Sequence, residues 1–171
     1  MADLVKLCHK AGFPGARTYI QSGNVVFDTD ASEAAVKAAL ERALASKLRP
    51  PVGVLVRSAA EIDRVLARNP FEEAPPNRVI VLFLDEPPPK STLARVQPPG
   101  GEQLVLRGRE LYIHFPDGQG ASRLEVPLAA RGTGRNLNTV TKLAAMARAL
   151  DDGATAAPPA NGGNRRARTR S

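Results

Sequence analysis

Residues 132–143, GTGRNLNTVTKL, combine residue types that can bind an anion with the start of an expected helix. Unpaired backbone N–H groups and the positive end of the helix dipole attract a phosphate or a carboxylate at such a start. A dinucleotide fingerprint is excluded because Leu137 stands where G-x-G-x-x-G requires its third glycine, and the Gly-Lys-Ser/Thr of a P-loop is missing. The candidate anion ligands in this stretch are Arg135, Asn136, Asn138, Thr139 and Lys142. The alternative is simple capping of the helix by Asn136 or Asn138, which needs no ligand.

A second polar cluster lies in RTYIQSGNVVF, residues 17–27, at the turn of an expected hairpin. Its donors and acceptors could recognise a phosphate, an amide or a base. Turn serines and asparagines more often satisfy their own backbone, so this alternative also stays open. The candidate residues here are Arg17, Gln21, Ser22 and Asn24.

The remaining reactive side chains predict no reaction. One cysteine and two histidines exclude an internal disulfide and a structural zinc site, and we expect no metal and no cofactor. His114 lies in an expected strand opposite Gln103, without a positioned acid–base partner, and Cys8 lies on the apolar face of the first expected helix. An enzyme of an unrecognised kind, using the same polar surface, remains an alternative to a binding protein.

Hydrophobic periodicity, helix caps and turn residues predict the helices and strands that must position these side chains. The first part of the chain predicts a helix over 2–11, a hairpin over 17–27, a helix after Ser32, a strand over 52–57 and a helix over 58–68 with Glu61 in a capping box. The second part predicts a strand over 78–84, a short helix over 91–96, a hairpin over 104–115, a helical stretch over 122–131 and a final helix from Asn138 to Leu150.

This order predicts an α+β fold made of two pseudo-repeated ferredoxin-like (βαββαβ) halves, the first lacking its opening strand. The halves are residues 1–68 and 78–150, joined by a connector over 69–77 and followed by a disordered basic tail over 151–171. The opening strand of this motif is central, so its loss would leave ladder groups open on both neighbours. We therefore expect the gap to be filled by residues upstream of Met1, by a rearranged segment or by a partner strand.

The chain resembles the DUF1697 family of small bacterial proteins, which have no established activity. RTYIQSGNVVF (17–27), NPF (69–71), LRGRELYIHFPDGQGASRL (106–124) and GRNLNTVTKLAAMA (134–147) carry the resemblance, in the order the family has them. Members usually begin with a strand that ends in a Gly-rich loop, which this chain lacks. It also departs from the family at Leu137, where tryptophan is common, and at residues 125–127, where a Thr-Asn type of sequence is usual.

The charge and hydropathy of the chain indicate which classes of binding partner to expect. The net charge of +7 is spread over the body and an arginine-rich tail (Arg165, Arg166, Arg168 and Arg170) rather than clustered, so specific nucleic-acid binding is not expected and weak binding through the tail is an alternative. No apolar run is long enough to span a bilayer and the first residues lack a signal-peptide pattern, so we expect a cytoplasmic protein. The favoured hypothesis is a protein that binds a small phosphorylated or carboxylated ligand; its oligomeric state is not predicted.

Overall fold

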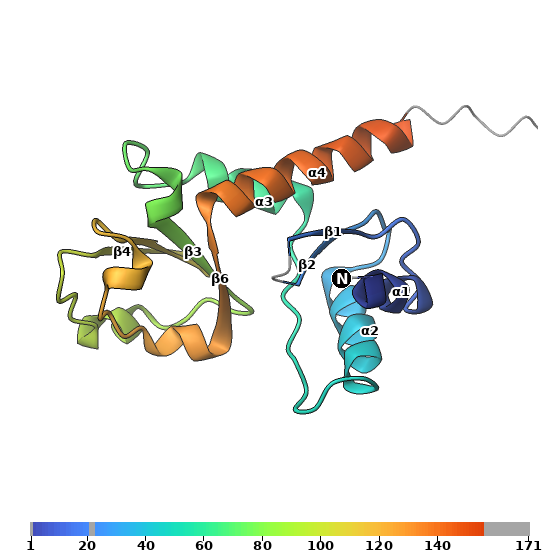
Figure 1. Cartoon of the computed structure of the whole chain (residues 1–171), viewed down its shortest axis with the longest axis horizontal. Helices are drawn as coiled ribbons and strands as arrows, with labels where there is room; N and C mark the ends of the chain where they lie inside the picture. The colour runs from blue at the N-terminus through green and yellow to red at the C-terminus, as the bar shows by residue number, and fades with distance from the viewer. Residues whose placement is uncertain (1, 21–22, 156–171) are drawn as a thin grey trace, which may run out of the picture.

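The computed structural model describes residues 2–20 and 23–155 of the 171-residue chain. The chain is a mixed α+β protein with two antiparallel sheets (Figure 1). Its α-helices are α1 (Ala2–Lys10), α2 (Glu33–Ala45), α3 (Ala59–Ala67) and α4 (Leu137–Thr155). Its strands are β1 (Arg17–Tyr19), β2 (Asn24–Val26), β3 (Val79–Leu84), β4 (Gln103–Arg107), β5 (Glu110–His114) and β6 (Gly132–Asn136). Short 3-10 turns are η1 (Pro76–Arg78), η2 (Lys90–Arg95), η3 (Gln119–Ala121) and η4 (Pro127–Arg131).

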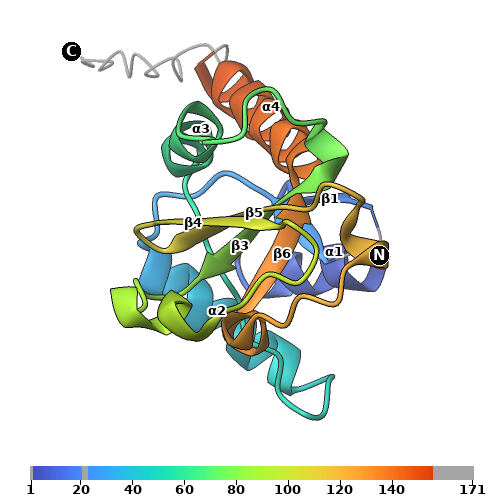
Figure 2. The same ribbon diagram turned by 90° about the vertical axis from the view of Figure 1, so that its left-hand side faces the viewer.

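The four-stranded sheet has the order β4-β5-β3-β6, with β3 antiparallel to both of its neighbours (Figure 2). The sequence of β3, VIVLFL, is apolar throughout because both faces of this strand are covered. Its side chains alternate between two clusters, with Val81 in one and Leu82 in the other. The strand therefore lies at the centre of the larger core.

Helices α3 and α4 contact each other and cover one face of this sheet (Figure 1). On that face Val65 of α3 and Val140 of α4 are buried against β3, and the Tyr112 hydroxyl donates a 2.8 Å hydrogen bond to the Val65 carbonyl. The opposite face is covered by η2, η4 and the chain around Leu124 rather than by long helices. Pro127 starts η4, and three prolines precede η2, which are positions at the start of a helical segment where proline is tolerated.

The two-stranded sheet β1-β2 packs with α1 and α2 around a smaller core. Cys8 of α1 is fully buried there, together with Val36 of α2, and the rings of Phe13 and Phe27 stack with centroids 4.5 Å apart. Ser32 caps α2 through the Ala35 N–H, as its position predicts. This part of the molecule carries the hairpin that the sequence singled out.

Residues 52–57 connect α2 to α3 and contribute Val54 and Val56 to the smaller core. We predicted a strand here, and among the described residues the structure pairs this segment with no strand. Instead, side chains of α2 hold its backbone: the Val54 N–H donates to Glu41 Oε1 at 3.0 Å, and Lys37 Nζ donates to the Val54 carbonyl at 2.9 Å. A strand requires a neighbouring ladder, which this segment does not have.

Three further predictions need correction. The short helix expected over 91–96 is the 3-10 turn η2, and the helical stretch expected over 122–131 contains only the 3-10 turn η4, in its last five residues. The final helix begins at Leu137 and extends to Thr155, beyond the boundary at Leu150 where we placed the start of a disordered tail. Ile20, expected in a strand, follows β1 with a positive φ of 50° and is exposed, because the chain already turns at this residue.

Candidate anion site and the adjoining cavity

Arg135 lies near the end of β6, paired with Val81 of β3, where its side chain reaches the β1-β2 hairpin. Its Nε donates to Asn24 Oδ1 at 2.7 Å, and its Nη1 donates to Thr133 Oγ1 at 2.6 Å and to the Gly134 carbonyl at 2.7 Å. The structure therefore brings together one residue from each of the two polar stretches that the sequence predicted as a site. These two residues are 111 positions apart in the chain.

Asn24 is the first residue of β2 and is buried. Its Nδ2 donates to the Tyr19 carbonyl across the hairpin at 3.3 Å, which leaves Oδ1 facing Arg135. The turn therefore fixes the orientation of the amide, and the amide in turn positions the guanidinium. Burial lowers the pKa of Arg135 below its ordinary value, because a charged group loses hydration in this position.

Asn136 caps α4, since its Oδ1 accepts a 3.0 Å hydrogen bond from the Thr139 N–H. Of the two possible caps, the structure thus selects Asn136 over Asn138. Thr139 is buried behind this cap, whereas Asn138 is exposed. The first N–H groups of a helix have no acceptor within the helix, and here the Asn136 side chain supplies one for the Thr139 N–H.

The two glycines of the GTGRNL stretch lie in strand β6 and not in a phosphate-binding loop. A Cβ on Gly132 would lie 2.4 Å from the Phe83 carbonyl oxygen, and one on Gly134 would lie 3.2 Å from a methyl of Ile80. The sequence needs glycine here because β6 and β3 approach closely. The capping interpretation is thereby right for the helix start, and close packing explains the glycines.

The other predicted ligands lie elsewhere or outside the described residues. Lys142 and Arg17 are exposed, and neither lines the cavity described below. Gln21 and Ser22 lie outside the described residues, as do Arg165, Arg166, Arg168 and Arg170 of the tail. Arg135 and Asn24 are therefore the pair on which the candidate site depends.

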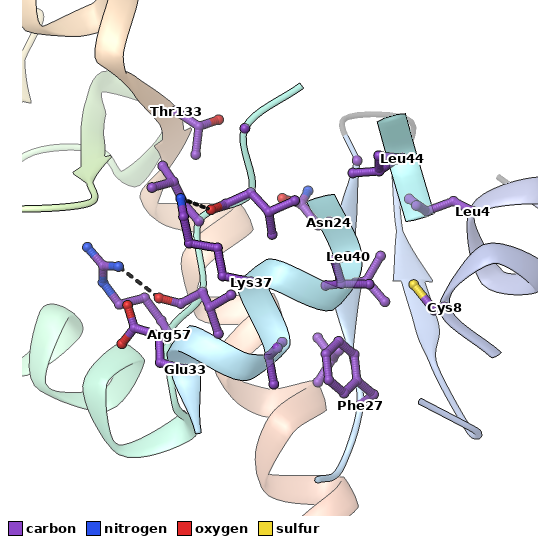
Figure 3. Close-up of a pocket in the computed structure, with 18 of the residues that line it drawn as sticks. Leu4, Cys8, Asn24, Phe27, Glu33, Lys37, Leu40, Leu44, Arg57 and Thr133 are labelled. Atoms are coloured by element: carbon purple, nitrogen blue, oxygen red, sulfur yellow. Dashed lines mark hydrogen bonds between the residues drawn. The ribbon is translucent and has the colours of Figure 1, made fainter. Parts of the chain in front are cut away.

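Both residues line a large open cavity of about 1760 Å³ between the smaller core, α4 and residues 52–57. Apolar side chains from α1 and α2 form one side of it, and polar ones including Thr133 and Lys37 form the other (Figure 3). Leu143 and Ala147 of α4 also line it. The sequence predicted neither the cavity nor its size, because these walls come from segments far apart in the chain.

A charged cluster next to the cavity joins the two parts of the molecule. Arg109, in the β4-β5 turn, donates to both carboxylate oxygens of Glu33 at 2.7 and 2.8 Å and to Glu61 Oε1 at 2.7 Å. Close by, Arg57 Nε donates to Glu110 Oε1 at 2.9 Å, and the Arg57 side chain is 5% exposed. No local sequence signal predicts these pairs.

The pKa values in this cluster follow its hydrogen bonds. The Arg109 side chain lowers the pKa of Glu33, and the same contact raises the pKa of Arg109. Burial alone would raise the pKa of Glu61, but hydrogen bonds from Ser58 and Arg109 outweigh it and the pKa is lowered. All three groups are thus charged at neutral pH, which fits a structural ionic link.

Within the described residues no group of three or more His, Cys, Asp and Glu side chains is arranged to hold a metal ion. His114 pairs with Gln103 as expected, and it is half-buried against the ring of Phe71. None of the helices in the described part of the chain is both long enough and apolar enough to cross a membrane.

Comparison with known proteins places the chain in a family. A conserved bacterial protein from Streptococcus pneumoniae has a similar solved structure, with a TM-score of 0.71 and 22% identity over 86% of this chain and 88% of that one. This likeness shows a shared fold. None of the curated proteins compared with the chain matches it. The family model described as "Protein of unknown function (DUF1697)" matches residues 1–112, which confirms the resemblance seen in the sequence, and the chain belongs to the DUF1697 family.

Proposed function

We propose that this protein binds a small anionic ligand, phosphorylated or carboxylated, where Arg135 meets the β1-β2 hairpin. The observation that carries the proposal is the half-buried guanidinium of Arg135, which lines the cavity and is held there by hydrogen bonds to Asn24, Thr133 and Gly134. Hydrogen bonds that involve an ionised group are about twice as strong as neutral ones, so this arginine is the residue best able to hold an anion.

Preorganisation supports the same proposal. Asn24 and Thr133 hold the Arg135 side chain in one orientation before any ligand arrives, so little side-chain freedom remains to be lost on binding. The start of α4, one residue after Asn136, adds the positive end of a helix dipole on the same side. The ligand would thus meet a fixed charge at the edge of a large cavity.

We also propose that the fold is a pseudo-repeat of two ferredoxin-like halves. The strand order β4-β5-β3-β6 supports this for the second half, since the first strand of a βαββαβ unit lies between its third and fourth strands. In the first half, β1, β2 and residues 52–57 would correspond to the second, third and fourth strands. Both α3 and α4 follow the fourth strand of their half, in agreement with such a repeat.

Titration with inorganic phosphate and with acetate tests the anion site. Binding is measured by thermal shift and by calorimetry. Arg135→Gln should weaken binding about tenfold or more, which corresponds to the loss of a charge-assisted hydrogen bond of about 1.5–3 kcal/mol. Arg131→Gln is the matched control, because Arg131 lines the same cavity but is exposed. An unchanged affinity in Arg135→Gln, or equal losses in both variants, would show that no specific site exists at Arg135.

A further inference from the structure

Strand β4 forms one edge of the four-stranded sheet, on the side of the molecule away from α1 and α2 (Figure 1). β5 pairs with it on one side, and among the described strands it has no neighbour on the other. We propose that β4 is a docking edge for a second copy of the chain, whose own β4 adds antiparallel to it about a two-fold axis at Val105. The proposal does not rest on the anion site or on the large cavity, because no residue of β4 belongs to either.

The hydrogen bonds of β5 show which main-chain groups of β4 point outward. The Leu84 N–H donates to the Arg109 carbonyl at 2.9 Å, so the odd-numbered residues of β5 and its flank bond to β3. The even-numbered residues of β5 therefore bond to β4, where their partners in the register are the odd-numbered residues. Leu104 and Leu106 alternate with those residues, so their N–H and carbonyl groups point away from β5 toward the free edge.

Most of the features that keep natural edge strands from pairing are missing in β4. The strand contains no proline, it pairs with β5 without a bulge, and its one charged residue, Arg107, lies at its end. Val105 is only partly buried and belongs to neither of the core clusters that this sheet forms. The opposite edge, β6, is in contact with η1, η4 and α4. Among the described strands of this sheet, β4 is therefore the edge best suited to accept another strand.

The sequence of β4, QLVLR, is complementary to itself when a second copy runs antiparallel to it. With Val105 opposite Val105 of the second copy, Leu104 lies opposite Leu106, and their outward main-chain groups can exchange two hydrogen bonds in each of the two pairs. The same register places Gln103 opposite Arg107 of the second copy, so no like charges meet. Sliding the copies by two residues would place Val105 opposite a polar residue, so its burial selects the central register. Because this contact is symmetric, it closes into a dimer and does not extend into a fibre.

Electrostatic repulsion limits the strength of this dimer. Each copy carries a net charge of +7, and the added ladder is only as long as β4. We therefore expect a weak, reversible dimer that forms at high protein concentration and becomes stronger as salt screens the repulsion. Sedimentation velocity over about a hundredfold range of protein concentration measures the monomer–dimer equilibrium of the full chain.

Opposite substitutions at Gln103 test the register. The side chain is exposed, so both variants should fold as the wild-type chain does, which circular dichroism checks. Gln103→Glu should tighten the dimer about threefold or more, and Gln103→Lys should weaken it by a similar factor, because symmetry places the new charge opposite Arg107 twice. Thr141→Glu and Thr141→Lys are the matched controls, since they change the net charge equally at an exposed position of α4, which contacts the opposite edge strand.

A cysteine at the two-fold axis gives a direct readout of the pairing. Residues that face each other between the hydrogen-bonded pairs of antiparallel strands have Cα atoms about 4.5 Å apart, within the range that a disulfide spans. A mild thiol oxidant should therefore link two copies of Val105→Cys into a covalent dimer. The wild-type chain should stay unlinked, because its Cys8 is buried, and Thr141→Cys controls for random collisions.

Tighter association of Gln103→Glu, weaker association of Gln103→Lys and rapid linkage through Val105→Cys would together support the paired edge. A chain that stays monomeric at every concentration and salt would overturn the proposal. A dimer that responds equally to the Gln103 and Thr141 substitutions would overturn it as well, because the contact would then lie on another surface. Linkage of Thr141→Cys as fast as that of Val105→Cys would have the same meaning.

Discussion

The ionic link at Arg109 gives a prediction whose size follows from the structure. Arg109→Gln removes three charge-assisted hydrogen bonds of 2.7–2.8 Å, two to Glu33 and one to Glu61. The Arg109 side chain is 21% exposed, while Glu33 and Glu61 are 37% and 25% exposed, so solvent screens part of each interaction. One such hydrogen bond contributes about 1.5–3 kcal/mol when it is desolvated. Because solvent screens all three bonds, we expect Arg109→Gln to lower the free energy of unfolding at pH 7 by only about 2 kcal/mol in total.

The pH dependence of this loss has a defined sign. The folded-state pKa values of Glu33 and Glu61 are lowered, so their contribution is present above the unfolded pKa of about 4.3 and disappears as the pH falls through the folded values. The difference between the wild-type chain and Arg109→Gln should therefore be full at pH 7 and small near pH 3. Urea unfolding followed by circular dichroism at both pH values measures it.

Arg148→Gln is the matched control for this experiment. Arg148 also pairs with a carboxylate, that of Asp63 at 2.6 Å, but the two side chains are 58% and 40% exposed. We expect its midpoint of unfolding to stay within the error of the measurement at either pH. A loss in Arg109→Gln no larger than that in Arg148→Gln, or one that persists unchanged at pH 3, would refute the assignment of Arg109 as the link between the two parts.

Three other substitutions or treatments have expected outcomes. Gly132→Ala should lower the free energy of unfolding by about 2 kcal/mol or more in urea titrations, because the new Cβ would lie 2.4 Å from the Phe83 carbonyl oxygen. An unchanged free energy of unfolding would contradict the close approach of β6 to β3. Asn136→Ala should cost about 1 kcal/mol in the same assay through loss of the cap on the Thr139 N–H, and Asn136→Asp should restore most of it. Cys8 should resist a thiol reagent in the folded protein and react fully in urea, because the side chain is completely buried and burial raises the pKa of its thiol. Rapid labelling of the folded chain would argue against the packing of α1.

Features set by neighbouring residues were predictable from the sequence. Ser32 and the capping box of Ser58 with Glu61 are where the pattern indicates, because a cap needs only a side-chain oxygen next to a helix start. The two-residue turn before Glu110 also placed Gln103 opposite His114, as expected. Local geometry is sufficient for these interactions.

Features that depend on distant partners were not predictable. Residues 52–57 have strand-like composition, yet a strand also needs a neighbour with which to pair, and composition does not reveal one. Similarly, Arg135 was a candidate from its place before a helix, while its contact with Asn24 and the burial that lowers its pKa arise from packing across 111 residues. The sequence indicated which residues were polar and near an element boundary; the fold decided which of them meet. Ligand binding at that meeting point stays a prediction.

The central position of β3 has a consequence for how the protein opens. β3 has ladder partners on both sides over nearly its whole length, whereas β1 and β2 share three residue pairs. Amides of β3 should therefore exchange with solvent deuterium only when the whole molecule unfolds, and those of the hairpin through local opening of much lower free energy. A protease that waits for such local opening would first cleave the amino-terminal part and leave the four-stranded sheet as a resistant fragment.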